Sequence, residues 1–121
     1  MYLFLDTETT GITPENRIVS ICWSLYDTDG DELTSEYNII YPDSFTIPSG
    51  AAAIHGITTT VACVRGIPLN KALTQLRNEI AEYEPELYVG HNVSFDRPIV
   101  LNEYGRLSED DNISNLPTFA P

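Results

Sequence analysis

Two carboxylates lie close together near the N-terminus, at the end of an apolar segment. Asp6 and Glu8 are separated by one residue, and the two-residue period of a strand places both side chains on the same face. Like charges at this spacing repel each other unless one is protonated or a cation lies between them. Hard divalent cations prefer such oxygen ligands. The pair is therefore a candidate metal site, although two solvated acids at a strand end would show the same pattern.

A third carboxylate, Asp96, follows a second short apolar segment and a Gly-His-Asn sequence at positions 90–92. Ligand sites in open α/β sheets gather where strands end and helices begin. Asp96 is thus a candidate third ligand, while as an acid in the first turn of a helix it would also interact favourably with the helix dipole. His91 is interpreted as a hydrogen-bonding loop residue rather than a metal ligand.

The segments between these acids predict alternating strands and helices. A strand over 2–5 reaches Asp6 and is closed by Thr-Thr-Gly at 9–11, and apolar spacing of three and four predicts a helix over about 69–84. The remaining predicted elements are a hairpin with strands 17–26 and 33–41, a strand 87–89, a helix 94–104 stopped by Gly105 with Pro98 in its first turn, and a strand starting near 116. The connection 42–68 is long enough to be functional. This order indicates an α/β domain that begins with an antiparallel meander.

Composition limits the partners that the protein can bind. The 121 residues suffice for one domain, and 18 acidic against 6 basic residues give a formal charge of −12, so a broad basic surface for duplex binding is absent. Any contact with phosphate should depend on metal ions; otherwise the acids form a solvated surface. Cys22 and Cys63 lie in apolar surroundings, which favours buried free thiols and a cytoplasmic location. No apolar run approaches a membrane span, and no signal peptide is expected.

Three motifs occur in an order that is typical of one family. Residues 4–11 read Phe-Leu-Asp-Thr-Glu-Thr-Thr-Gly, residues 54–58 read Ile-His-Gly-Ile-Thr, and residues 90–96 read Gly-His-Asn-Val-Ser-Phe-Asp. Across residues 1 to 119 they resemble the DnaQ-like (DEDD) 3'-5' exonucleases, the group that includes the proofreading epsilon subunit of bacterial DNA polymerase III. The resemblance implies a ribonuclease H-like fold: a mixed five-stranded sheet, with an antiparallel meander followed by parallel strands, flanked by helices. It also implies that residues 1–121 form a single exonuclease-like domain that is incomplete at its C-terminus.

The resemblance further implies roles for individual residues. Asp6 would bridge two Mg²⁺ or Mn²⁺ ions, Glu8 would ligate the ion that activates water, and Asp96 would help to hold the other. The expected reaction is hydrolysis of the terminal phosphodiester at the 3' end of single-stranded nucleic acid. Residues expected to bind the terminal nucleotide are Thr7, Thr9, Thr10, Gly11, His55, Asn92 and Phe95, although a place in the core would suit Phe95 equally well.

The sequence departs from the family after Asp96. Relatives carry a fourth acid preceded by a histidine or tyrosine that acts as general base, and none of the later acids, Glu103, Glu109, Asp110 and Asp111, has such a residue at the right spacing. Losing the base alone typically costs about 10² to 10⁴ in rate. The chain alone is therefore expected to be a weak or inactive nuclease.

Three explanations of this departure are open. The chain is a fragment of a longer exonuclease, a short form completed by another subunit, or a remnant retained for binding. The alternative function is accordingly a non-catalytic module that binds a 3' end or a protein. An unfinished sheet edge near 116–119 further predicts a homodimer or a complementing protein chain.

Overall fold

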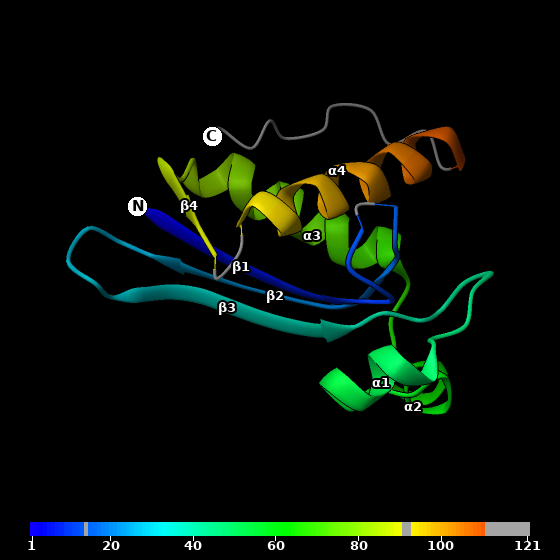
Figure 1. Cartoon of the computed structure of the whole chain (residues 1–121). Helices are drawn as coiled ribbons and strands as arrows, with labels where there is room; N and C mark the ends of the chain where they lie inside the picture. The colour runs from blue at the N-terminus through cyan, green and yellow to red at the C-terminus, as the bar shows by residue number, and fades with distance from the viewer. Residues whose placement is uncertain (14, 91–92, 111–121) are drawn as a thin grey trace.

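The structure is a computed structural model that describes residues 1–13, 15–90 and 93–110, without the side chains of 93–95 and 108–110. Four strands and four helices follow one another along this part of the chain (Figure 1). In order they are β1 (Tyr2–Thr9), β2 (Ile18–Tyr26), β3 (Glu32–Ile39), α1 (Ser49–His55), α2 (Thr59–Arg65), α3 (Leu69–Tyr83), β4 (Leu87–Val89) and α4 (Val93–Asp110).

The strands form one mixed sheet in the order β3-β2-β1-β4. The first three strands pair antiparallel, whereas β4 pairs parallel to β1. The predicted meander followed by a parallel strand is confirmed. Because β4 reaches only as far as the pairing of Val89 with Phe4, the second half of β1 extends past the end of β4. That uncovered stretch of β1 carries the first two candidate acids.

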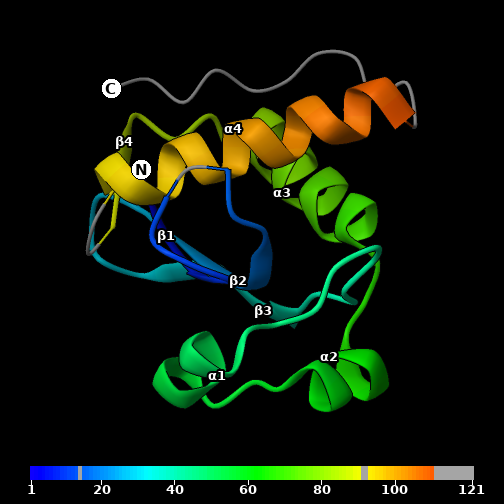
Figure 2. The same cartoon turned by 45° about the vertical axis from the view of Figure 1, so that its right-hand side comes forward.

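Helices α3 and α4 cover one face of the sheet (Figure 1 and Figure 2). The apolar residues of α3 recur every three or four positions, so they form one stripe that packs against the strands. Alternation along β1 points Leu3, Leu5 and Thr7 into this layer. The residues of this main core are Leu3, Leu5, Ile18, Ile21, Trp23, Leu25, Ile40, Ala72, Leu73, Leu76, Ile80, Ile99, Val100 and Tyr104.

Among the described residues, only α1, α2 and the segment before them cover the opposite face of the sheet, and they do so at one end. Val19 of β2 packs there against Ile47, Ile57 and Ala62. The rest of this face, hereafter the open face, carries exposed apolar side chains: Phe4 is 42%, Tyr37 60%, Leu87 53% and Val89 36% exposed. From strand register, the open face consists of Tyr2, Phe4, Asp6, Cys22, Ser24, Tyr26, Ser35, Tyr37, Leu87 and Val89.

Several predictions from the sequence are wrong. Helix α4 does not stop at Gly105 but continues to Asp110, and Pro98 lies beyond its first turn. The connection 42–68 holds two helices that were not predicted. Cys63 is an exposed free thiol rather than a buried one, and Cys22 is free and half-buried. The strand predicted near 116–119 lies outside the described residues.

Within the ranges that the structure describes, none of the helices is long and apolar enough to cross a membrane.

Truncating the core stripe of α3 should destabilise the protein. Leu73 is fully buried, so Leu73→Ala should lower the free energy of unfolding by about 2 to 5 kcal/mol through lost burial and an unfilled cavity. Urea unfolding measures this change. Ile54→Ala is the control, because Ile54 is 83% exposed and its loss should change stability by less than about 0.5 kcal/mol. Equal losses in the two variants would contradict the described core.

Candidate active site

The first turn of α4 brings Asp96 to the uncovered stretch of β1. The Thr7 hydroxyl donates a hydrogen bond of 2.6 Å to Oδ1 of Asp96. Both residues are buried, with Thr7 7% and Asp96 2% exposed. The contact forms because β4 ends at Val89 and α4 begins at Val93, so that the first turn of α4 lies beside the part of β1 that extends past β4. Two residues 89 positions apart in sequence therefore meet at one point.

Asp6 and Glu8 flank Thr7 on β1, and their side chains lie on the face of the strand opposite to the Thr7 side chain. Asp6 is exposed and Glu8 half-buried, whereas Thr7 between them is buried. The strand period of two therefore places Asp6 and Glu8 on one face, as the sequence predicts, and Asp96 next to the backbone that separates them. All three carboxylates surround a single residue, Thr7, and together form what we call the acid cluster.

The acid cluster perturbs the ionisable groups around it. Burial raises the pKa of the Asp96 carboxyl, the charges of Asp6 and Glu8 raise it further, and the hydrogen bonds from Thr7 oppose the shift. Burial likewise raises the pKa of the Cys22 thiol, and the charges of Asp6, Asp96 and Glu8 add to that rise. Cys22 pairs with Asp6 across β1 and β2. Mutual repulsion within the cluster is therefore part of the site, and a cation would relieve it.

The three carboxylates are chemically suited to a divalent ion, but their side chains do not lie close enough together in this structure to bind one. Over 1–13, 15–90 and 93–110, no three His, Cys, Asp or Glu side chains lie close enough together to hold a metal ion. The physical reason is that Asp96 turns toward Thr7 on the core side, while Asp6 lies on the open face. Three carboxylates are the oxygen ligands that Mg²⁺ and Mn²⁺ prefer, so the residues fit such ions in kind.

The loop that follows β1 is closed tightly on itself. The Thr10 amide donates to the Arg17 carbonyl at 3.0 Å, and the Arg17 amide donates to the Thr10 hydroxyl at 2.9 Å. A side chain at Gly11 would meet the Asn16 amide group at 2.7 Å, so the close approach favours glycine there. Thr9 donates to the Gly11 carbonyl. These threonines and Gly11, expected to bind substrate, thus lie in a preformed loop directly after the acids.

His55 ends helix α1 and carries an unused hydrogen-bonding nitrogen. Its Nδ1 accepts a hydrogen bond of 3.1 Å from the Ile57 amide, so the proton of the neutral ring belongs on Nε2. That Nε2 atom is buried and has no partner among the described residues. The α1–α2 pair packs on Val19, next to the Ser20–Glu8 pairing, which places it at the acidic end of the sheet.

Two of the residues expected to bind substrate are not located by the structure. Asn92 lies outside the described residues, and so does the side chain of Phe95.

Sequence reasoning missed one buried acid of this region, Glu103. It was considered only as a possible fourth acid, yet it is fully buried and forms ion pairs with Arg17 and Arg106 at 2.9 and 2.6 Å. Its distance of seven residues from Asp96, two helical turns, is the signal that could have placed both on one side of α4.

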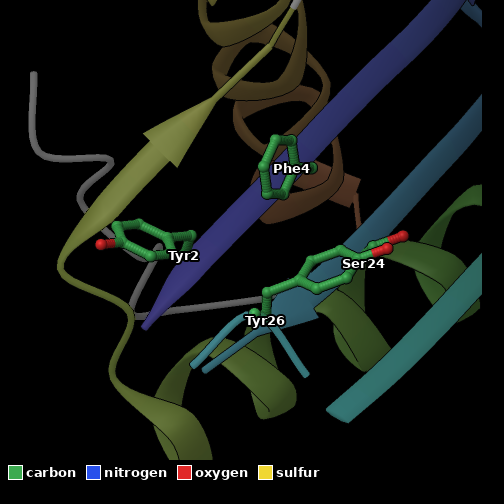
Figure 3. A pocket seen from close by; sticks show the side chains of 5 residues that line it. Tyr2, Phe4, Ser24 and Tyr26 are labelled. Carbon is green, nitrogen blue, oxygen red and sulfur yellow. The ribbon is translucent and has the colours of Figure 1, made fainter. Parts of the chain in front are cut away.

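Two shallow hollows lie side by side on the open face. One, of about 360 Å³, reaches from Asp6 and Cys22 to Val89 and Gly90. The other, of about 410 Å³, is lined by Tyr2, Phe4, Ser24, Tyr26 and Gly30 (Figure 3). The rings of Phe4 and Tyr26 meet edge to face there, with centroids 5.3 Å apart. The acidic end of the sheet is thus continuous with an apolar, aromatic surface.

The raised pKa of Asp96 predicts how its charge affects stability. Because the folded-state pKa lies above the ordinary value of 3.8, the carboxyl contributes stability that is fully present below pH 3.8 and is lost as pH rises through the folded-state pKa. Without divalent cations, Asp96→Asn should therefore be at least as stable as the parent at pH 7 and should lose less stability between pH 4 and pH 7. Urea unfolding in EDTA measures both; a steeper loss in Asp96→Asn would contradict the assignment.

Comparison with known proteins places this arrangement in one family. The family model described as Exonuclease (RNase_T) matches residues 3–115. No curated protein sequence matches the chain. Among solved structures, Escherichia coli exonuclease I in complex with a dT13 oligonucleotide and the same enzyme in complex with dA16 each match with a TM-score of 0.75 and 25% identity, over 87% of this chain and 23% of theirs. The chain thus spans about a quarter of the length of exonuclease I. On the family match and the shared mixed sheet, the chain belongs to the DnaQ-like exonuclease family.

Proposed function

We propose that this chain forms the acid-bearing part of a metal-dependent 3'-5' exonuclease site that hydrolyses terminal phosphodiesters of single-stranded nucleic acid. The observation that carries the proposal is the buried hydrogen bond from Thr7 to Asp96, which brings a third carboxylate beside the Asp6–Glu8 pair in a member of the exonuclease family. The solved complexes of exonuclease I with oligonucleotides support a nucleic-acid substrate.

Each residue of the site has a proposed task. Asp6, Glu8 and Asp96 would hold Mg²⁺ or Mn²⁺, which requires the Asp96 carboxylate to turn from Thr7. The bound ions would supply an activated water and neutralise charge on the attacking and leaving oxygens. The Thr9–Gly11 loop and the Nε2 donor of His55 would hold the terminal nucleotide, together with Asn92 and Phe95.

The charge of the chain makes the ions central to substrate binding. At a formal charge of −12, the chain repels a phosphate backbone unless cations lie between them. Binding of a 3' end, and not only its hydrolysis, should therefore require divalent ions.

The open face supports the proposal that another protein surface completes the domain. An apolar sheet face is normally buried against a second layer, and a patch of exposed apolar side chains, such as the four on the open face, is typical of an interaction site. We propose that a second copy, a complementing chain or a segment outside residues 1–121 covers it. The general base and the fourth acid would come from the same source.

A non-catalytic module that binds a 3' end or a protein is the second candidate. It is favoured by the lack of a three-ligand metal group in the described part of the chain. In that case the pocket would bind a strand end without cutting it.

Removal of one acid should separate these functions. At a high concentration of Mn²⁺, a 3'-labelled single strand should release mononucleotides slowly, as expected of a weak nuclease, and Asp6→Asn should reduce the rate by at least about tenfold, the lower limit for groups around a metal ion. Asp29→Asn is the matched control, since Asp29 is an exposed acid in the β2–β3 turn. Mononucleotide release is followed by gel electrophoresis.

Each outcome of this assay has a distinct meaning. Metal-dependent binding without release supports the non-catalytic module. Release that Asp6→Asn and Asp29→Asn leave equally unchanged contradicts the acid cluster as the active site.

Covering of the open face by a second copy should be visible in solution. Sedimentation at increasing concentration should show a dimer for the parent chain and a monomer for Tyr37→Glu, because a charge at this 60% exposed position would be buried without a partner. Ile54→Glu, also exposed but off this face, is the control. A parent chain that stays monomeric rejects the homodimer.

A further inference from the structure

Glu103 is a fully buried carboxylate with three hydrogen-bond donors around it. Its Oε1 accepts from Arg17 Nε at 2.9 Å and from Arg106 Nη1 at 2.6 Å. Its Oε2 accepts from the Ile18 backbone amide at 3.0 Å. The carboxyl group thus lies between two guanidinium groups and is directed at the first residue of β2.

These contacts tie helix α4 to the loop that follows the acids of β1. Arg17 is the residue that closes the loop onto Thr10 through two backbone-linked hydrogen bonds. Arg106 extends the connection, since its Nη2 donates to the Glu15 carbonyl at 2.7 Å. The Arg17 guanidinium also lies over the Phe45 ring, 4.7 Å from its centroid. The second half of the loop, at Glu15 and Arg17, is therefore held against α4.

Glu103 and Asp96 act on the same side of α4. Seven residues make nearly two full turns of an α-helix, so the two carboxylates point the same way from the helix axis. Asp96 accepts a hydrogen bond from the Thr7 hydroxyl of β1, and Glu103 accepts one from the Ile18 amide of β2. Helix α4 is thus fixed to the sheet by two carboxylates, one at the acid cluster and one two turns further along.

Stability alone explains this arrangement poorly. A buried ion pair is often no more stabilising than apolar side chains of the same volume, and the surrounding core is apolar. What a carboxylate adds is direction, because each oxygen must meet a donor at a set angle. Such a contact fixes the position of the helix along the strands, which apolar packing does less strictly.

We propose that Glu103 is a positioning residue, whose contacts with Arg17, Arg106 and Ile18 hold the Thr10–Arg17 loop and helix α4 where Asp96 meets Thr7, beside Asp6 and Glu8. The inference rests on the proposed function, since it assigns Glu103 a role in the geometry of a metal site. Glu103 itself touches neither substrate nor metal.

The test compares two neighbours on α4 that each lose a buried hydrogen bond. Glu103→Gln removes the negative charge and places an amide NH₂ opposite one of the N–H donors, which loses its acceptor. Tyr104→Phe loses the 2.8 Å hydrogen bond from its hydroxyl to the Leu73 carbonyl and does not change the contacts of the loop. Arg106→Gln is a milder second variant at a side chain that is 34% exposed. Should Glu103→Gln fail to fold, Arg106→Gln gives the same comparison with a smaller effect.

In the metal-free protein, amide hydrogen exchange measures how firmly the loop and helix α4 are held against the sheet. We expect Glu103→Gln to raise exchange about tenfold at Thr7, Thr10 and Ile18, because the loop and the helix separate locally from the sheet. Tyr104→Phe should leave these amides unchanged. If exchange at Thr7 is the same in Glu103→Gln as in the parent, Glu103 does not position the acid cluster.

Mn²⁺ titration of the folded variants gives the second readout. Glu103→Gln should bind Mn²⁺ about tenfold to a hundredfold more weakly than the parent, the range for residues that orient metal ligands, and Tyr104→Phe should bind it equally well. Equal affinity in Glu103→Gln and the parent overturns the inference. A parent chain that binds no Mn²⁺ at the acids instead rejects the proposed function, and exchange at Thr7 then decides the positioning role by itself.

Discussion

The short parallel pairing of β4 with β1 is the constraint on which the site depends. Because β4 ends at Val89, no described residue pairs with the outer edge of β1 beyond Phe4, and the first turn of α4 contacts this stretch from the core face. Thr7 then meets Asp96 at a buried hydrogen bond. The acid cluster is therefore a product of strand length and topology as much as of its acids.

The same arrangement stores electrostatic repulsion. Asp96 is buried beside two other carboxylates, and its pKa is raised as a result, in a chain whose formal charge is −12. Natural proteins keep such unfavourable arrangements mainly where function requires them. Thr7 and Glu103 offset the repulsion in different ways, one by a hydrogen bond to the cluster and the other by holding the helix that carries it. A bound cation would remove the remaining repulsion, so the proposed metal and the fold support each other.

Periodicity predicts much of this fold, and long-range contacts set its limits. The stripe from Leu69 to Ile80 predicts α3, and the alternation of β1 predicts that Asp6 and Glu8 share a face. Helices α1 and α2 could not be predicted from periodicity because only Ala62 is buried in them. The one local indication is Thr58, which caps α2 by accepting a hydrogen bond from the Val61 amide. Gly105 fails as a stop because its cost of about 1 kcal/mol is outweighed by the contacts of Glu103 and Tyr104 beside it. Neither the partner of Thr7 nor the Arg17 and Ile18 donors to Glu103 follow from local sequence, since the residues of each pair lie more than 80 positions apart.

We propose that three carboxylates, brought together by the β1–β4 pairing, form a shared site for divalent cations. A crystal structure of the protein soaked in Mn²⁺, with the ions located by anomalous scattering, tests this proposal most directly. We expect an Mn²⁺ ion bound by oxygens of both Asp6 and Asp96, with the Asp96 carboxylate turned from Thr7. A structure in which the Thr7–Asp96 hydrogen bond is intact and no ion lies between these acids, at an Mn²⁺ concentration that saturates other sites, would contradict it.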